Sequence, residues 1–145
     1  MTADLRRLVH RLGYAGLIPF VLGSALIWLI GDRSLDQHAF VSLALSAYAG
    51  LVIAFLGGIH WGLSFARGLP VRQPLVWGGF AMLLGWLGVL MSPYAGLALH
   101  GAVLIACYVV DRRVYPQLGA ADWLTLRFRL TAVASLSCFL AAAGS

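Results

Sequence analysis

Long apolar stretches limit what this chain can fold into more than any other feature of its sequence. They cover residues 12–30, 39–66, 75–91, 94–110 and 123–144. A helix needs about 20 apolar residues to cross a hydrocarbon core of about 30 Å. Only 10% of the residues are charged and 61% are apolar, which leaves too few polar side chains to cover a soluble domain. The sequence therefore predicts an all-α, multi-pass membrane protein in which one domain, residues 1–145, forms a bundle of five transmembrane helices.

The two ends of the chain carry features of the membrane surface. In segment 4–11, leucines at helical spacing lie on one side of the predicted helix and arginines lie on the opposite side. This pattern predicts a short amphipathic helix at the interface. The stretch 12–30 is longer than the apolar region of a signal peptide and no cleavage motif follows it, so we expect it to be retained. The last stretch starts at Trp123, and Arg127 and Arg129 in its first turns can reach the lipid headgroups.

The basic residues predict how the chain is oriented. All ten are arginines, and five spans place nine of them on the side of the N-terminus: Arg6, Arg7, Arg11, Arg67, Arg72, Arg112, Arg113, Arg127 and Arg129. Arg33 alone lies on the other side. The positive-inside rule then predicts a cytoplasmic N-terminus and an outside C-terminus, in a bacterial inner membrane. These arginines will also attract anionic lipid at the cytoplasmic face, whereas such short basic loops beside membrane spans do not favour nucleic-acid binding.

Small residues recur at helical spacing in every span and predict close contacts between helices. Helices in lipid approach where small residues let their backbones meet. We expect this role for Gly57, Gly58, Gly62, Gly85 and Gly88. The two cysteines, Cys107 and Cys138, lie about 6 Å and about 20 Å from the same membrane face. They are therefore expected to be free thiols that form neither a disulfide nor a metal site.

His60 is the most informative residue for function. It lies inside a span, about 9 Å from the end expected to be cytoplasmic. An ionisable residue at that depth is a functional candidate, and we expect it to face the bundle interior. The alternative is a neutral imidazole bonded to a neighbouring helix, for example to Asp111 or Tyr108. Trp61 is either an interfacial aromatic residue or a ring that stacks on a ligand.

Two further constellations suggest ligands. His60 and His100 on different helices could supply both axial ligands of a haem. Asp111 ends one span among arginines and Arg127 opens the next, with Thr131 one turn further on. These residues either form an ion pair that closes the bundle or line a basic pocket for an anionic lipid, a quinone head or a carboxylate.

Several segments resemble the transmembrane-protein-69-like family, a group of small bacterial and mitochondrial membrane proteins that is defined as a domain of unknown function. The segments are Leu12-Gly13-x-x-Gly16-Leu17-Ile18-Pro19-Phe20, Tyr48-Ala49-Gly50, Phe55-Leu56-Gly57-Gly58-Ile59-His60-Trp61-Gly62, and Trp123 with Leu126-Arg127-x-x-Leu130-Thr131. Leu124 stands where the family pattern has tyrosine. The resemblance implies an energy-transducing membrane and no established reaction. It gives weight to Pro19, His60, Trp61, Arg127 and Thr131.

The sequence leaves three functions open. The first is an accessory subunit, assembly factor or scaffold of a larger membrane complex, without catalytic machinery. It is favoured because no nucleophile–base pair, carboxylate pair, phosphate loop or metal-ligand spacing is present. The alternative is a ligand-binding or redox protein that uses His60 on a quinone, haem or other tetrapyrrole, or lipid. A transporter is disfavoured by the short length and the lack of an inverted repeat.

Overall fold

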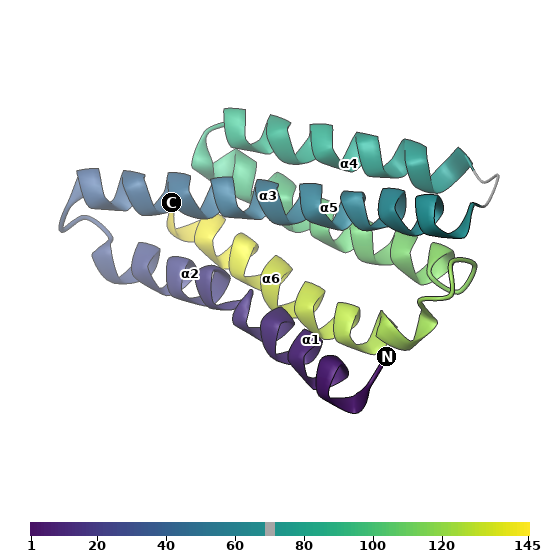
Figure 1. Ribbon diagram of the computed structural model, residues 1–145. Coiled ribbons are helices and arrows are strands. Elements are labelled where there is room, and N and C mark those ends of the chain that lie inside the picture. Colours follow the sequence, from purple (N-terminus) through teal and green to yellow (C-terminus); the bar gives the residue numbers. More distant parts are fainter. Residues whose placement is uncertain (69–71) are drawn as a thin grey trace.

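The computed structural model describes residues 1–68 and 72–145, and this part of the chain is all-α (Figure 1). The helices are α1 (Ala3–Ala15), α2 (Ile18–Ile30), α3 (Leu35–Arg67), α4 (Arg72–Leu90), α5 (Pro93–Val114), the short 3-10 helix η1 (Ala121–Trp123) and α6 (Leu124–Gly144). Within the described residues, five helical segments are long and apolar enough to cross a membrane, with α1 and α2 counted as one segment and η1 with α6 as another.

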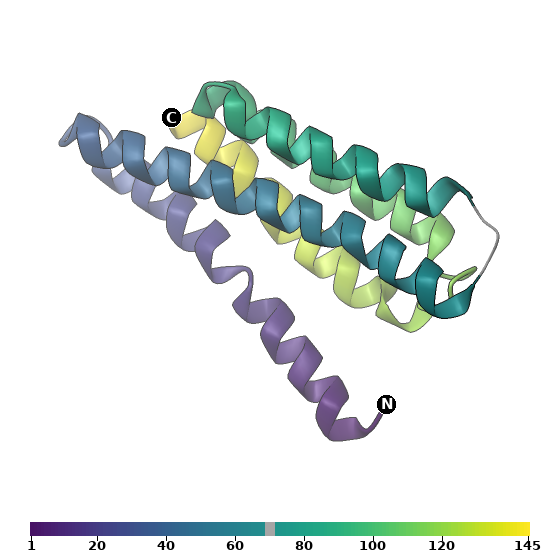
Figure 2. The same cartoon turned by 45° about the horizontal axis from the view of Figure 1, so that its top comes forward.

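The first span is broken between α1 and α2. The break lies at Gly16 and Leu17, whereas the sequence suggested a surface helix over residues 4–11 and a span from residue 12. Pro19 lies in the first turn of α2, where its missing N–H is tolerated. The Tyr48 hydroxyl of α3 donates a hydrogen bond to the Gly16 carbonyl at 2.7 Å, which fixes the break against the bundle. Figure 2 shows α1 diverging from α3, while α1 keeps contact with the start of α6 through Tyr14 and Arg129.

Helix α3 is the central element, because α2, α4 and α5 all pack against it. The Ser34 hydroxyl caps its first turn by accepting from the Gln37 N–H at 3.3 Å. Its last turn ends at Gly68, whose φ of 60° is in the left-handed region that glycine adopts without strain. The resulting helix of 33 residues holds His60 within the bundle, near the end that carries Arg67.

Glycines bring α3 and α4 into backbone contact, although not all of those expected. A Cβ on Gly57 would lie 2.6 Å from the Gly78 carbonyl oxygen, and one on Gly85 would lie 2.8 Å from the Gly50 carbonyl oxygen. Gly88 packs against the His100 ring. The expectation for Gly58 and Gly62 is wrong within this chain, because a Cβ on either would meet nothing within 4 Å. Adjacent residues are about 100° apart around a helix, so Gly58 points away from the face on which Gly57 packs.

The two ends of the bundle differ in their polar groups. The start of α1, the end of α3 and the connection from α5 to α6 lie at one end, with the arginine-rich segments (Figure 1). The C-terminus lies at the other end. There the Trp28 indole donates to the Leu140 carbonyl at 2.8 Å, and a His38 ring nitrogen lies 2.8 Å from the Gly144 carbonyl. Cys107 and Cys138 are buried, free thiols.

Candidate functional site

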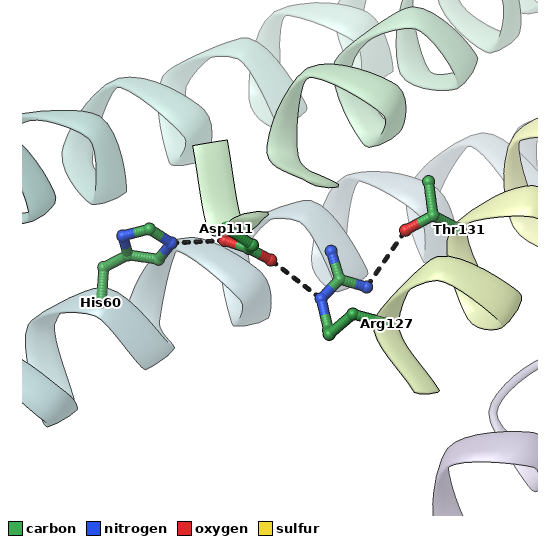
Figure 3. Close-up of polar contacts among 4 residues, drawn as sticks. All are labelled: His60, Asp111, Arg127 and Thr131. Carbon is green, nitrogen blue, oxygen red and sulfur yellow. Dashed lines mark hydrogen bonds and ion pairs between the residues drawn. The ribbon is translucent and has the colours of Figure 1, made fainter. Parts of the chain in front are cut away.

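Four polar side chains from three helices form one connected network inside the bundle (Figure 3). His60 of α3 lies with Nε2 2.5 Å from Asp111 Oδ1 of α5. Arg127 of α6 donates from Nε to Asp111 Oδ2 at 2.8 Å. The same guanidinium donates from Nη1 to the Thr131 hydroxyl at 3.2 Å. Asp111 is therefore the centre of the network, and it joins α3, α5 and α6.

The side chains of the network are almost completely buried. The side chains of His60 and Asp111 are 0% and 1% exposed, and that of Arg127 is 9% exposed. Asp111 is ion-paired with Arg127 and accepts with both oxygens, so His60 must donate through Nε2–H. The other ring nitrogen of His60, Nδ1, is buried and has no partner among the described residues.

Tyr115 extends the network at the end of α5. Its ring centroid lies 5.9 Å from that of His60, and the residue is 2% exposed. Burial, together with the negative charge of Asp111, raises the pKa of the Tyr115 phenol well above its ordinary value. The phenol therefore stays protonated at physiological pH and can donate a hydrogen bond. Tyr115 was not among the residues predicted from the sequence, although it follows Asp111 by four positions and so lies on the same helical face.

An apolar groove of about 840 Å³ lies against this network. Helices α1 and α2 form one wall and α3 the other, with α6 and the α5–α6 connection between them. The lining is almost entirely aliphatic and aromatic. Its polar side chains are Tyr48, Arg67, Tyr115, Arg127 and Thr131. Three of these five, Tyr115, Arg127 and Thr131, are buried, while Arg67 is exposed and Tyr48 is part-buried.

The residues suggested by the sequence fall into three groups. Arg127 and Thr131 line the groove, whereas His60 and Asp111 lie behind them and hold Arg127 in place. Trp61 lies apart, because its indole donates to the Leu75 carbonyl at 2.8 Å and its ring packs on Phe65. Tyr108, the other partner considered for His60, packs on Phe128 instead.

The structure does not bring His60 and His100 together as a pair of haem ligands. His100 Nε2 lies 2.9 Å from the Gly85 carbonyl oxygen, and Nε2 of His60 faces Asp111. His100 and Asp111 are eleven positions apart on α5, which is about 16 Å along the helix. In this structure the two rings lie at different depths and are bonded to different helices, an arrangement that does not favour haem ligation by this pair. In residues 1–68 and 72–145, no cluster of three or more His, Cys, Asp or Glu residues could hold a metal ion.

Comparisons with known proteins place the chain in a sequence family. The family described as "Protein of unknown function (DUF3429)" matches residues 5–143. Transmembrane protein 69 of Xenopus tropicalis is 34% identical over 82 residues, which are 54% of this chain and 31% of that protein. The match thus spans about a third of the length of this curated relative. No solved structure matches the chain. Together with its five long apolar helical segments, these similarities identify a multi-span integral membrane protein.

Proposed function

This chain belongs to the family of proteins of unknown function DUF3429, and we propose that it binds a hydrophobic ligand with a polar head in the groove beside Arg127. The main support for this proposal is the groove itself. Its volume of about 840 Å³ is within the range of small-molecule sites, which is roughly 300–1,000 Å³. Its lining is apolar except for a few polar groups, among them the buried Tyr115, Arg127 and Thr131.

The buried polar groups distinguish this groove from an ordinary crevice filled by lipid chains. Polar side chains in a membrane span are costly unless they are paired, and their presence marks ligand or ion sites. Here His60 and Asp111 fix the guanidinium of Arg127 from behind, and Thr131 fixes it from the side. A ligand head would therefore meet a preorganised group, while its tail lies between α1–α2 and α3.

The position of the groove suggests where the ligand comes from. The polar residues Arg67, Tyr115 and Arg127 lie near the arginine-rich end of the bundle, which we expect to face the cytoplasm of a bacterial inner membrane. Wall residues such as Leu51 and Phe55 are largely exposed on the surface of α3 that faces lipid. A ligand dissolved in the membrane would reach the groove sideways, with its head near the headgroup layer.

A pair of isoleucine variants tests the proposal. Ile59 is a half-buried residue of the groove wall, and Ile105 is exposed on α5 outside the groove. We expect small-molecule mass spectrometry of the protein, purified in mild detergent, to detect a bound ligand. Ile59→Trp should reduce its content at least tenfold by filling the groove, whereas Ile105→Trp should not. Equal ligand content in both folded variants, or no enrichment over bulk lipid in the unmodified protein, would contradict the proposal.

We also propose a second role, as an accessory subunit or scaffold within a larger membrane complex. It is favoured by Gly58 and Gly62, which lie four positions apart on the exposed side of α3 and leave backbone open to an incoming helix. Co-purification with partner subunits should be lost in Gly58→Leu and Gly62→Leu. It should be retained in Gly79→Leu, another glycine with nothing within 4 Å. Retention in all three variants would argue against this surface.

A further inference from the structure

We propose that the groove selects a ligand whose head is uncharged and only accepts hydrogen bonds, as the oxidised ring of a membrane quinone does. This inference rests on the proposed function, since it specifies which head the groove prefers. It comes from the polarity of the hydrogen-bonding groups that remain at Tyr115, Arg127 and Thr131 after the internal network is satisfied.

Both carboxylate oxygens of the network already accept a hydrogen bond, and the unpartnered Nδ1 of His60 does not line the groove. Asp111 Oδ1 is bonded by His60, and Asp111 Oδ2 by Arg127. The Thr131 hydroxyl oxygen accepts from Arg127 Nη1, so its own hydrogen is left to donate. Neither His60 nor Asp111 lines the groove. The network therefore offers no carboxylate or imidazole acceptor to a ligand.

The groups left beside the groove are donors. Tyr115 lines the groove within hydrogen-bond reach of Asp111 and Arg127, and it keeps its proton because burial raises the pKa of its phenol. Arg127 Nη2 is a buried donor without a partner in the described part of the chain. With the Thr131 hydroxyl, these groups can serve a head that carries acceptor oxygens. A head with hydroxyl groups of its own, such as a quinol, would direct its hydrogens at these donors and find no acceptor. Buried hydrogen-bonding groups would then remain unsatisfied.

The charge balance disfavours an anionic head at the same place. The positive charge of Arg127 is neutralised by Asp111, whose Oδ2 is 2.8 Å from Arg127 Nε. A carboxylate or phosphate on this guanidinium would also approach the Asp111 carboxylate, and like charges repel strongly in a dry site. A carbonyl oxygen avoids this repulsion. Arg67 could attract an anion, but it is exposed, where the attraction is weakened by solvent and salt.

Binding of three probes to the full chain in nanodiscs tests the inference. The probes are oxidised decylubiquinone, its quinol, and dodecanoate as a carboxylate with a single chain. Quinones quench indole fluorescence, and Trp123 lines the groove. We expect saturable quenching by the oxidised quinone. The quinol and dodecanoate should each displace it only at concentrations about tenfold higher or more, which corresponds to one buried donor left unsatisfied.

Conservative variants locate the donors. Tyr115→Phe and Thr131→Val each remove one hydroxyl and keep the shape, and each should weaken quinone binding about tenfold. The matched controls are Tyr108→Phe, a tyrosine packed on Phe128, and Thr125→Val, an exposed threonine of the first turn of α6. Both controls should bind as the unmodified protein does. The ranking of the three probes needs no variant, so it tests the inference even if a variant fails to fold.

The outcomes separate the inference from the function on which it rests. If dodecanoate or the quinol binds as tightly as the oxidised quinone, or more tightly, the acceptor-only head is wrong while the groove remains a ligand site. Equal quinone binding by Tyr115→Phe, Thr131→Val and their controls would also contradict the placement of the ligand head beside these two hydroxyls. If no probe binds and Ile59→Trp loses no co-purified molecule, the ligand-binding function itself is wrong.

Discussion

At the scale of single residues, Asp111 is the most consequential position of this protein. Its carboxylate is buried in a span, where it needs a cation as a partner. Arg127 supplies that cation at 2.8 Å, and His60 supplies a further donor. Three helices are joined through this one carboxylate. Replacing it should therefore lower the stability of the bundle whether or not a ligand is bound.

Replacing Asp111 should destabilise the bundle more than replacing any surface acid. Asp111→Asn leaves Arg127 as a buried charge without a counter-ion, a loss of about 3–5 kcal/mol by analogy with broken buried pairs. Asp122→Asn is the control, because Asp122 is exposed and lies 4.0 Å from Arg6; its effect should stay within about 0.5 kcal/mol. Unfolding by detergent titration measures both.

A double variant shows whether the loss comes from the unpaired charge. Asp111→Leu combined with Arg127→Met removes both charges and should recover part of the stability lost in Asp111→Asn. If Asp111→Asn unfolds at the same detergent fraction as the unmodified protein, the ion pair does not hold α5 to α6.

At the scale of helices, the contact between α3 and α4 depends on glycines at defined positions. Gly57 and Gly78 bring the two backbones together, and Gly50 and Gly85 repeat the contact further along. Two neighbouring glycines of α3 nevertheless have opposite surroundings, since Gly57 is packed and Gly58 is open. Sequence spacing alone could not distinguish them, because both have glycine partners at helical intervals.

A pair of alanine variants should differ in the sign of their effect. Gly57→Ala places a methyl group 2.6 Å from the Gly78 carbonyl oxygen, so the helices must separate, and overpacking of this kind costs about 1–3 kcal/mol. Gly58→Ala meets nothing and gains helix propensity, so it should be neutral or slightly stabilising. Unfolding titrations in one detergent measure both variants. A Gly57→Ala protein as stable as Gly58→Ala would contradict the close contact.

At the scale of the whole molecule, the arginines and the groove lie towards the same end. This end holds the start of α1, the end of α3 and the connection from α5 to α6 (Figure 1). Arg6 lies over the Trp123 ring at 5.4 Å, and Arg129 donates to the Tyr14 hydroxyl at 3.3 Å, so α1 is tied to the start of α6 beside the groove. If this end faces the cytoplasm, the ligand head is presented to that side.

Cysteine labelling tests this orientation. Cys107 and Cys138 are buried, so they should not react, and single cysteines can be introduced at exposed Asp32 and Gln117. In spheroplasts, a membrane-impermeant maleimide should label Asp32→Cys from outside. Gln117→Cys should be labelled only after the membrane is opened. The reverse pattern would place the N-terminus and the groove end outside.

The sequence by itself determined that the chain lies in a membrane, how many spans it has and which polar residues are candidates for a site. Apolar stretches of membrane-crossing length, interrupted by arginines, are local features that do not depend on how the helices pack. His60, Asp111, Arg127 and Thr131 could be selected because polar groups in an apolar stretch need a partner. The pairing of His60 with Asp111 was one of the alternatives that the sequence left open.

Only the tertiary structure decided which of these residues meet and which face the groove. It separated Trp61 and His100 from the network, turned Gly58 and Gly62 outward, and added Tyr115. It also created the groove, because α1, which precedes the break at Gly16, diverges from α3 (Figure 2). In lipid, a leucine in the core and a leucine on the surface are equally apolar, so hydropathy cannot tell buried faces from exposed ones. The packing of small residues and the pairing of a few polar groups make that choice.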